Sequence, residues 1–132
     1  MRILIVDDAT TARIFAERYL NNIGFHDAEF IHAVDGEEGL EKAREKVPDF
    51  ILTDLIMPVM DGEELLKELK ADPALQHIPV LVMTSAGNDA RIGSLLGMGA
   101  SNVLAKPFSS SELYKAVKEV VDGMEEDDEW GE

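Results

Sequence analysis

Five short apolar segments, rich in β-branched residues, alternate along this chain with segments of helical periodicity. The apolar segments are Ile3–Val6, Phe30–Ala33, Phe50–Thr53, Val80–Thr84 and Asn102–Ala105. Runs such as Ile-Leu-Ile-Val are apolar at every position, which is typical of strands buried on both faces of a parallel sheet. Strands that alternate with helices predict an α/β fold in which right-handed crossovers cover both faces of the sheet. We therefore expect a doubly wound sandwich of five parallel strands and five helices.

The expected helices carry recognisable stripes and end signals. The first has apolar residues at i, i+3, i+4 and i+7 spacing and a stop at Gly24, and the third ends at Asp72-Pro73. The last begins with Ser109-Ser110-Ser111-Glu112, which predicts a capping box. The second and fourth are expected over Glu37–Lys46 and Asn88–Met98. The apolar stripe expected to face inward from the first helix is Ala12, Phe15, Ala16, Tyr19, Leu20 and Ile23.

Polar side chains follow four of the five strands, at the sheet edge where such folds bind ligands. They are Asp7 and Asp8, Asp54, Thr84 and Lys106. If the first and third strands are neighbours, their carboxylates lie about 5 Å apart. Carboxylates this close raise one another's pKa unless a cation lies among them. An all-oxygen set of ligands is suited to Mg²⁺.

A divalent cation, a hydroxyl and an ammonium around one carboxylate are the groups that hold a phosphoryl group in place. A carboxylate also attacks phosphorus as a nucleophile and gives an acyl phosphate. Asp54, on the central third strand, is the candidate, with Thr84 and Lys106 beside it. Each residue alone has a simpler interpretation: Asp8 and Thr84 as helix caps, Asp54 as a turn former, and Lys106 as a surface lysine.

The composition narrows the function further. The chain has 132 residues, of which 27 are acidic and 12 basic, and the formal net charge is −15. This charge argues against binding to nucleic acid or to anionic membranes. The chain has no cysteine, which excludes thiolate metal sites and cysteine nucleophiles. No apolar run is long enough to span a bilayer and the first residues do not resemble a signal peptide, so we expect a cytoplasmic protein.

Acidic residues are concentrated at the C-terminal end. Residues 122–132 hold seven acidic and no basic side chains, so the rest of the chain has 20 acidic and 12 basic residues and a net charge of −8. A segment that repels itself and has few apolar groups to bury is expected to be disordered. We therefore expect one domain over residues 1–121 and a disordered acidic tail over 122–132.

The combined motifs resemble the receiver domains of two-component response regulators, in particular the single-domain, CheY-like regulators. The motifs are Val6-Asp7-Asp8, Asp54-Leu55-Ile56-Met57-Pro58-Val59-Met60-Asp61-Gly62, Thr84-Ser85-Ala86, Gly99-Ala100 and Lys106-Pro107-Phe108. The resemblance covers residues 1 to about 121. It implies a flavodoxin-like fold with strand order 2-1-3-4-5.

The resemblance also implies a role for each matching residue. Asp54 matches the aspartate that a histidine kinase or phosphotransfer protein phosphorylates. Asp8 and Asp54 match side-chain ligands of Mg²⁺, Asp7 matches a metal-site carboxylate that acts mostly through metal-bound water, and Ile56 matches the position that offers its backbone carbonyl. Thr84 matches the switch hydroxyl and Lys106 the lysine that pairs with the phosphoryl group; the bond from Lys106 to proline is usually cis in the family. Such a domain is not an enzyme in the ordinary sense, because it catalyses only its own phosphorylation and dephosphorylation.

Four positions depart from the pattern of the chemotaxis regulators. They are Leu55 where tryptophan is usual, Val103 where many relatives have an aromatic switch residue or a histidine, and Ile56 and Ala86 where polar side chains often tune hydrolysis. Without polar groups to orient water, we expect a long-lived phosphorylated state. Chemotaxis remains one of several pathways that the sequence allows.

The expected output is a contact with a downstream target protein, and we expect a monomer. Two other hypotheses remain open. One is a pseudo-receiver that binds partners without phosphorylation, although such proteins usually lose an acidic residue or the lysine. The other is a phosphotransferase of the haloacid dehalogenase type with an aspartate nucleophile, which requires a second acid where this chain has Ile56.

Overall fold

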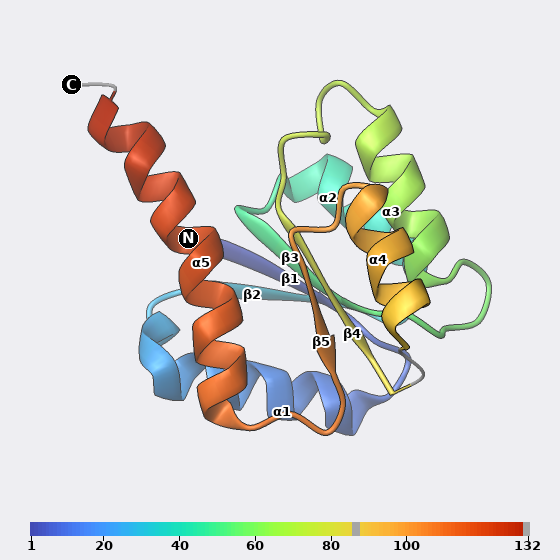
Figure 1. Ribbon diagram of the computed structural model, residues 1–132, viewed down its shortest axis with the longest axis horizontal. Helices are drawn as coiled ribbons and strands as arrows, with labels where there is room; N and C mark the ends of the chain where they lie inside the picture. The colour runs from blue at the N-terminus through green and yellow to red at the C-terminus, as the bar shows by residue number, and fades with distance from the viewer. Residues whose placement is uncertain (86–87, 131–132) are drawn as a thin grey trace.

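The computed structural model describes residues 1–85 and 88–130, which form five strands, five α-helices and one short π-helix (Figure 1). The strands are β1 (Arg2–Val6), β2 (Glu29–Ala33), β3 (Phe50–Asp54), β4 (Val80–Thr84) and β5 (Asn102–Ala105). The helices are α1 (Thr10–Leu20), the π-helix η1 (Asn21–Phe25), α2 (Gly36–Lys46), α3 (Gly62–Ala71), α4 (Asp89–Gly97) and α5 (Ser110–Trp130). These elements agree with the expected ones to within a few residues, α5 excepted.

The strands form one parallel sheet in the order β2-β1-β3-β4-β5. Helices α1 and α5 lie on one face of the sheet, and α2, α3 and α4 lie on the other (Figure 1). This arrangement confirms the doubly wound fold and its strand order. Because β1 pairs with β3, the chain segments that follow them leave the sheet side by side.

Two hydrophobic cores fill the layers on either side of the sheet. Successive residues of β1 point to opposite faces, so Ile3 and Ile5 belong to the core beneath α1 and α5, whereas Leu4 and Val6 belong to the core beneath α2, α3 and α4. All four side chains are fully buried. Burial on both faces fixes the strands, and therefore the positions of the residues at their carboxyl ends.

Side-chain caps define the beginnings of four helices. The capping residues are Asp35 for α2, Asp61 for α3, Asn88 for α4 and Ser109 for α5. Glu112 also accepts a hydrogen bond from the Ser109 amide, which confirms the predicted capping box. The N-cap of α1 is Ala9, with no side-chain hydrogen bond. The simpler interpretation of Asp8 and Thr84 as helix caps is therefore wrong.

Phe15 differs from its expected place in the core. It was expected in the inward stripe of α1, but the buried residues of that helix are Arg13, Ala16 and Leu20, and Phe15 is 51% exposed. The buried face of α1 is rotated away from Phe15. This rotation leaves the ring at the wall of a cavity of about 390 Å³, which also reaches Tyr19 and Phe108.

The C-terminal helix extends beyond the expected domain boundary. Helix α5 continues without a break to Trp130, so the backbone of residues 122–130 is helical where we expected disorder. Glutamate and methionine favour helix intrinsically, and Lys118 pairs with Asp122 one turn on, at 3.0 Å. Residues 131–132 lie outside the described part of the chain. Within that part, no helix combines the length and the hydrophobicity needed to cross a membrane.

Candidate phosphoacceptor and metal site

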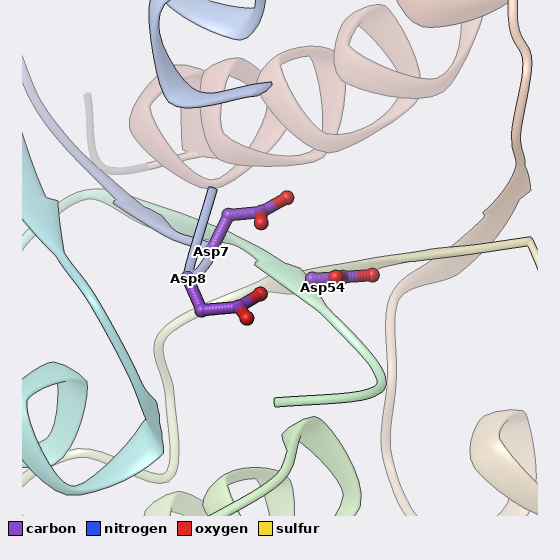
Figure 2. Close-up of side chains that lie close together, drawn as sticks. All are labelled: Asp7, Asp8 and Asp54. Carbon is purple, nitrogen blue, oxygen red and sulfur yellow. The ribbon is translucent and has the colours of Figure 1, made fainter. Parts of the chain in front are cut away.

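Three carboxylates meet at the carboxyl edge of the sheet. Asp7 and Asp8 follow β1, and Asp54 is the last residue of β3. Each residue offers an oxygen that lies within 4.8 Å of those of the other two. Figure 2 shows the three side chains extending toward the same side of the segments that carry them. The pairing of β1 with β3 thus brings together the acidic residues singled out from the sequence.

Asp7 is held in place from several sides. Its side chain is only 2% exposed. Its amide donates to the Ala33 carbonyl at 3.1 Å, which extends the β1–β2 ladder by one residue. One carboxylate oxygen accepts a hydrogen bond from the Ala9 amide at 2.9 Å, and the other lies 3.2 Å from the ammonium of Lys106. Asp8 is exposed, so the pair presents one buried and one accessible carboxylate.

Successive side chains in the loop after β3 are alternately buried in the core and exposed to solvent. Leu55 and Met57 are buried, whereas Ile56 between them is 63% exposed. The loop closes where the Gly62 amide donates to the Leu55 carbonyl at 2.8 Å. A side chain at Gly62 would collide with the carbonyl of Asp54, so glycine is required where α3 begins against β3. The carbonyl of Ile56 remains a predicted metal ligand.

Lys106 and Thr84 lie at the carboxyl ends of β5 and β4. The Lys106 ammonium lies 3.3 Å from a carboxylate oxygen of Asp54 and bridges it to Asp7. The Lys106 amide donates to the Thr84 carbonyl at 2.8 Å, which places the lysine directly after β5. The residue Thr84 is 1% exposed at the end of β4. Lys106 is therefore no solvated surface lysine, and its bond to Pro107 is cis as the resemblance implies.

The environment of Asp54 opposes its ionisation. Burial raises the pKa of this carboxyl above its ordinary value, and the negative charge of Asp7 acts in the same direction. The ammonium of Lys106 and the hydrogen bond from the Leu55 amide lower the pKa and offset part of this effect. One ammonium among three carboxylates leaves an excess of negative charge at the site.

The residues present fit a divalent cation. The donor set contains only oxygen, its members lie within 4.8 Å of one another, and its charge is incompletely neutralised by Lys106. Hard oxygen ligands with few protein contacts are typical of Mg²⁺, which retains several waters when bound. Asp7, Asp8 and Asp54 are the residues that would hold it.

Sequence reasoning missed one buried polar residue next to this site. Arg13 donates from Nη1 to the backbone carbonyl of Asp7 at 2.6 Å. Its position in the sequence held a signal, because Arg13, Ala16 and Leu20 have the i, i+3, i+7 spacing of a buried face. Among the four positions that differ from the pattern of the chemotaxis regulators, Val103 packs against the hydrophobic core. Ala86 lies outside the residues that the structure describes.

The raised pKa of Asp54 makes stability depend on pH. Because the pKa is higher in the folded state, protonation of Asp54 stabilises the folded chain. This stabilisation is complete below the ordinary pKa of 3.8 and is lost as the pH rises through the higher folded-state pKa. With EDTA present, Asp54→Asn should therefore have a higher Tm than the native chain at pH 7. The difference should shrink as the pH falls toward 4 in a series of thermal unfolding curves. Asp27→Asn, at a side chain that is 97% exposed, controls for the lost charge; an Asp54→Asn variant less stable than native at pH 7 would contradict the assignment.

Comparison with known proteins agrees with this geometry. Residues 3–118 match the sequence family described as response regulator receiver domain. The chain is 34% identical over 124 residues to chemotaxis protein CheY-3 of Vibrio cholerae, and the match covers 94% of each chain. It is 36% identical over 115 residues to hybrid signal transduction histidine kinase D of Dictyostelium discoideum; that match covers 87% of this chain but only 7% of the much longer relative.

A solved structure shows the same fold. The chemotaxis response regulator CheY4 of Vibrio cholerae superimposes with a TM-score of 0.80 at 31% sequence identity, covering 90% of this chain and 97% of the other. The family match spans most of the chain and includes every residue of the acidic cluster as well as Thr84 and Lys106. The chain therefore belongs to the family of response regulator receiver domains, whose general function is to be phosphorylated on an aspartate.

Proposed function

We propose that this protein accepts a phosphoryl group on Asp54 from the phosphohistidine of a histidine kinase or phosphotransfer protein. The observation that carries the proposal is the meeting of Asp7, Asp8, Asp54 and Lys106 at one edge of the sheet. Receiver domains interact with such kinases and with downstream targets.

The chemistry requires positioning and neutralisation of charge. The carboxylate of Asp54 attacks phosphorus, the O–P bond forms as the N–P bond of phosphohistidine breaks, and the histidine nitrogen keeps the bonding electrons. Lys106 holds the Asp54 oxygen at 3.3 Å before transfer and is within reach of a phosphoryl oxygen afterwards. The Thr84 hydroxyl, buried at the same edge, is the proposed donor to a second oxygen. This reaction is the domain's own phosphorylation rather than the turnover of a separate substrate.

Receiver domains bind Mg²⁺ at an acidic pocket, and we propose that Asp7, Asp8, Asp54 and the carbonyl of Ile56 hold it here. A bound Mg²⁺ neutralises charge on the phosphoryl oxygens during transfer. The carboxylates of this chain would fix its position, and Asp7 is itself held by hydrogen bonds from the Ala9 amide and Lys106.

The cavity beside α1 is the proposed docking place of the phosphodonor protein. It is continuous with the site, because Asp7 and Lys106 line it together with Phe15, Tyr19 and Phe108. A donor histidine must come within bonding distance of Asp54, so the protein that carries it has to cover this apolar wall. The half-exposed ring of Phe15 is the group most available to such a partner.

The proposed output surface consists of α4, β5 and α5. Gly93 lies inside α4, where an interior glycine costs roughly 1 kcal/mol against alanine. A helix weakened in this way shifts at low cost when the groups at the ends of β4 and β5 reorient. A monomeric state, a cytoplasmic location and a target in chemotaxis or another pathway stay predictions from the sequence.

Phosphorylation of Asp54 is tested by incubation with Mg²⁺ and a small acyl phosphate. We expect intact mass analysis to show one added phosphoryl group on the native chain and none on Asp54→Asn. Asp49→Asn, which changes the same residue type at the opposite end of β3, should be modified like the native chain. Full modification of Asp54→Asn would contradict the proposal. A native chain that is never modified and binds no Mg²⁺ would instead favour a pseudo-receiver.

The lifetime of the phosphorylated state is tested at Ile56. Its branched side chain offers no hydrogen bond to an attacking water and stands exposed beside the acceptor. Ile56→Asn should speed loss of the phosphoryl group about tenfold, which corresponds to about 1.4 kcal/mol in the barrier. Val59→Asn likewise replaces a branched apolar side chain with asparagine at another exposed position of the loop and should leave the rate unchanged. Equal rates in Ile56→Asn and the native chain, without any partner present, would refute this role of Ile56.

Movement of α4 is tested with Gly93→Ala. A Cβ at this position meets no atom within 4 Å outside the adjoining backbone of α4, so alanine should stiffen the helix without a clash. Amide hydrogen exchange in α4 should change on phosphorylation in the native chain, and this change should be smaller in Gly93→Ala. Gly123→Ala introduces alanine at another open helical position, in α5, and should not reduce the change in α4. A change confined to α2 and β2 would contradict the proposed output surface.

A further inference from the structure

Arg13 is a buried cation on the inner face of α1. The residue is 9% exposed, and none of the ion pairs among residues 1–85 and 88–123, whose side chains the structure describes, includes it. Its guanidinium donates instead to neutral acceptors: the Asp7 carbonyl at 2.6 Å, Nδ1 of His32 at 3.2 Å and the Thr10 hydroxyl at 3.3 Å. A buried charge is costly without such bonds, and an apolar side chain would fill the space at lower cost. The hydrogen bonds are therefore what distinguishes arginine here.

We propose that Arg13 is a positioning residue that fixes the peptide unit between Asp7 and Asp8. The carbonyl that accepts from Nη1 belongs to this peptide unit. The side chain of Asp7 has anchors of its own, namely the Ala9 amide and Lys106. Asp8 is exposed, and its direction depends on the backbone that carries it. By holding the Asp7 carbonyl, Arg13 keeps the Asp8 carboxylate turned toward Asp54.

His32 and Glu17 in turn hold Arg13. Because Nδ1 of His32 accepts from Nε of Arg13, the proton of the neutral ring lies on Nε2, which donates to Glu17 at 2.9 Å. Arg13 and Glu17 lie one turn apart on α1, with the imidazole of β2 between them. Without His32, the Nε–H of Arg13 would lose its acceptor in a buried place. A chain of hydrogen bonds thus runs from Glu17 through His32 and Arg13 to the backbone of the acidic cluster.

This inference rests on the proposed Mg²⁺ site, because its effect is on how well the three carboxylates are preorganised. Groups that orient metal ligands from behind typically change metal affinity by about 10- to 100-fold when they are removed. The positive charge of Arg13 has the opposite effect on Mg²⁺ affinity, because a cation near the cluster repels Mg²⁺. A variant that keeps the positive charge but loses the hydrogen bonds of the guanidinium separates the two effects.

The test measures Mg²⁺ affinity of the full chain by titration calorimetry. Arg13→Lys keeps the charge but cannot donate to Asp7 and His32 together, and should bind Mg²⁺ about tenfold more weakly. Arg13→Gln should also bind more weakly, whereas an effect of charge alone would make it bind more tightly. His32→Asn places an acceptor oxygen where Nδ1 lies and should stay near the native affinity. His32→Phe removes the acceptor and should resemble Arg13→Lys.

A second readout needs no metal. In nuclear magnetic resonance spectra recorded with EDTA, the Asp8 amide signal should shift in Arg13→Lys and His32→Phe but stay in place in His32→Asn. Native Mg²⁺ affinity and an unmoved Asp8 signal in the folded variants Arg13→Lys and His32→Phe would overturn the inference and leave the proposed function intact. A native chain that binds no Mg²⁺ would overturn both. If an Arg13 variant does not fold, the His32 pair decides, because that side chain is partly exposed on an edge strand.

Discussion

Burial of the Asp7 and Asp54 carboxylates beside one another is possible because Lys106 lies between them, 3.2 Å from one and 3.3 Å from the other. The two carboxylates have oxygens within 4.8 Å of each other and are partly withdrawn from water, so they repel each other strongly. The ammonium offsets this repulsion and joins the end of β5 to the ends of β1 and β3. The site is therefore also a contact that holds one edge of the sheet together.

The rest of the fold serves to keep this edge in register. Strands β1 and β3 are apolar on both faces, and helices cover each face, so neither strand is free to slide. The loop after β3 is anchored by Leu55 and Met57, which leaves Ile56 as its exposed residue near the acceptor. Position 62 accepts only glycine because α3 begins against the Asp54 carbonyl. Precise placement of the carboxylates follows from packing that lies outside the site.

The strands and the acidic cluster could be predicted because both depend on short patterns: continuous apolar runs, and polar residues directly after them. Phe15 and Arg13 could not be placed in this way. An apolar stripe fixes the buried face of a helix only to within part of a turn, and the neighbours of α1 turned Arg13 inward and Phe15 outward. The continuation of α5 was missed because net charge was weighed above the helix propensity of glutamate. The hydrogen-bond chain through His32 joins residues distant in sequence, which no local pattern reveals.

The order of the strands gives the charges of the site unequal freedom. Asp7 and Asp54 are carried by β1 and β3, each hydrogen-bonded to a strand on both sides, whereas Lys106 follows β5, an edge strand bonded only to β4 (Figure 1). Displacing β3 would disturb two ladders, whereas displacing β5 would disturb one. Asp7 and Asp54 thus lie on the more constrained strands, and Lys106 follows the less constrained strand, which lies between α4 and α5 in the proposed output surface. If the proposed phosphorylation occurs, the added charge would therefore meet least resistance at β5.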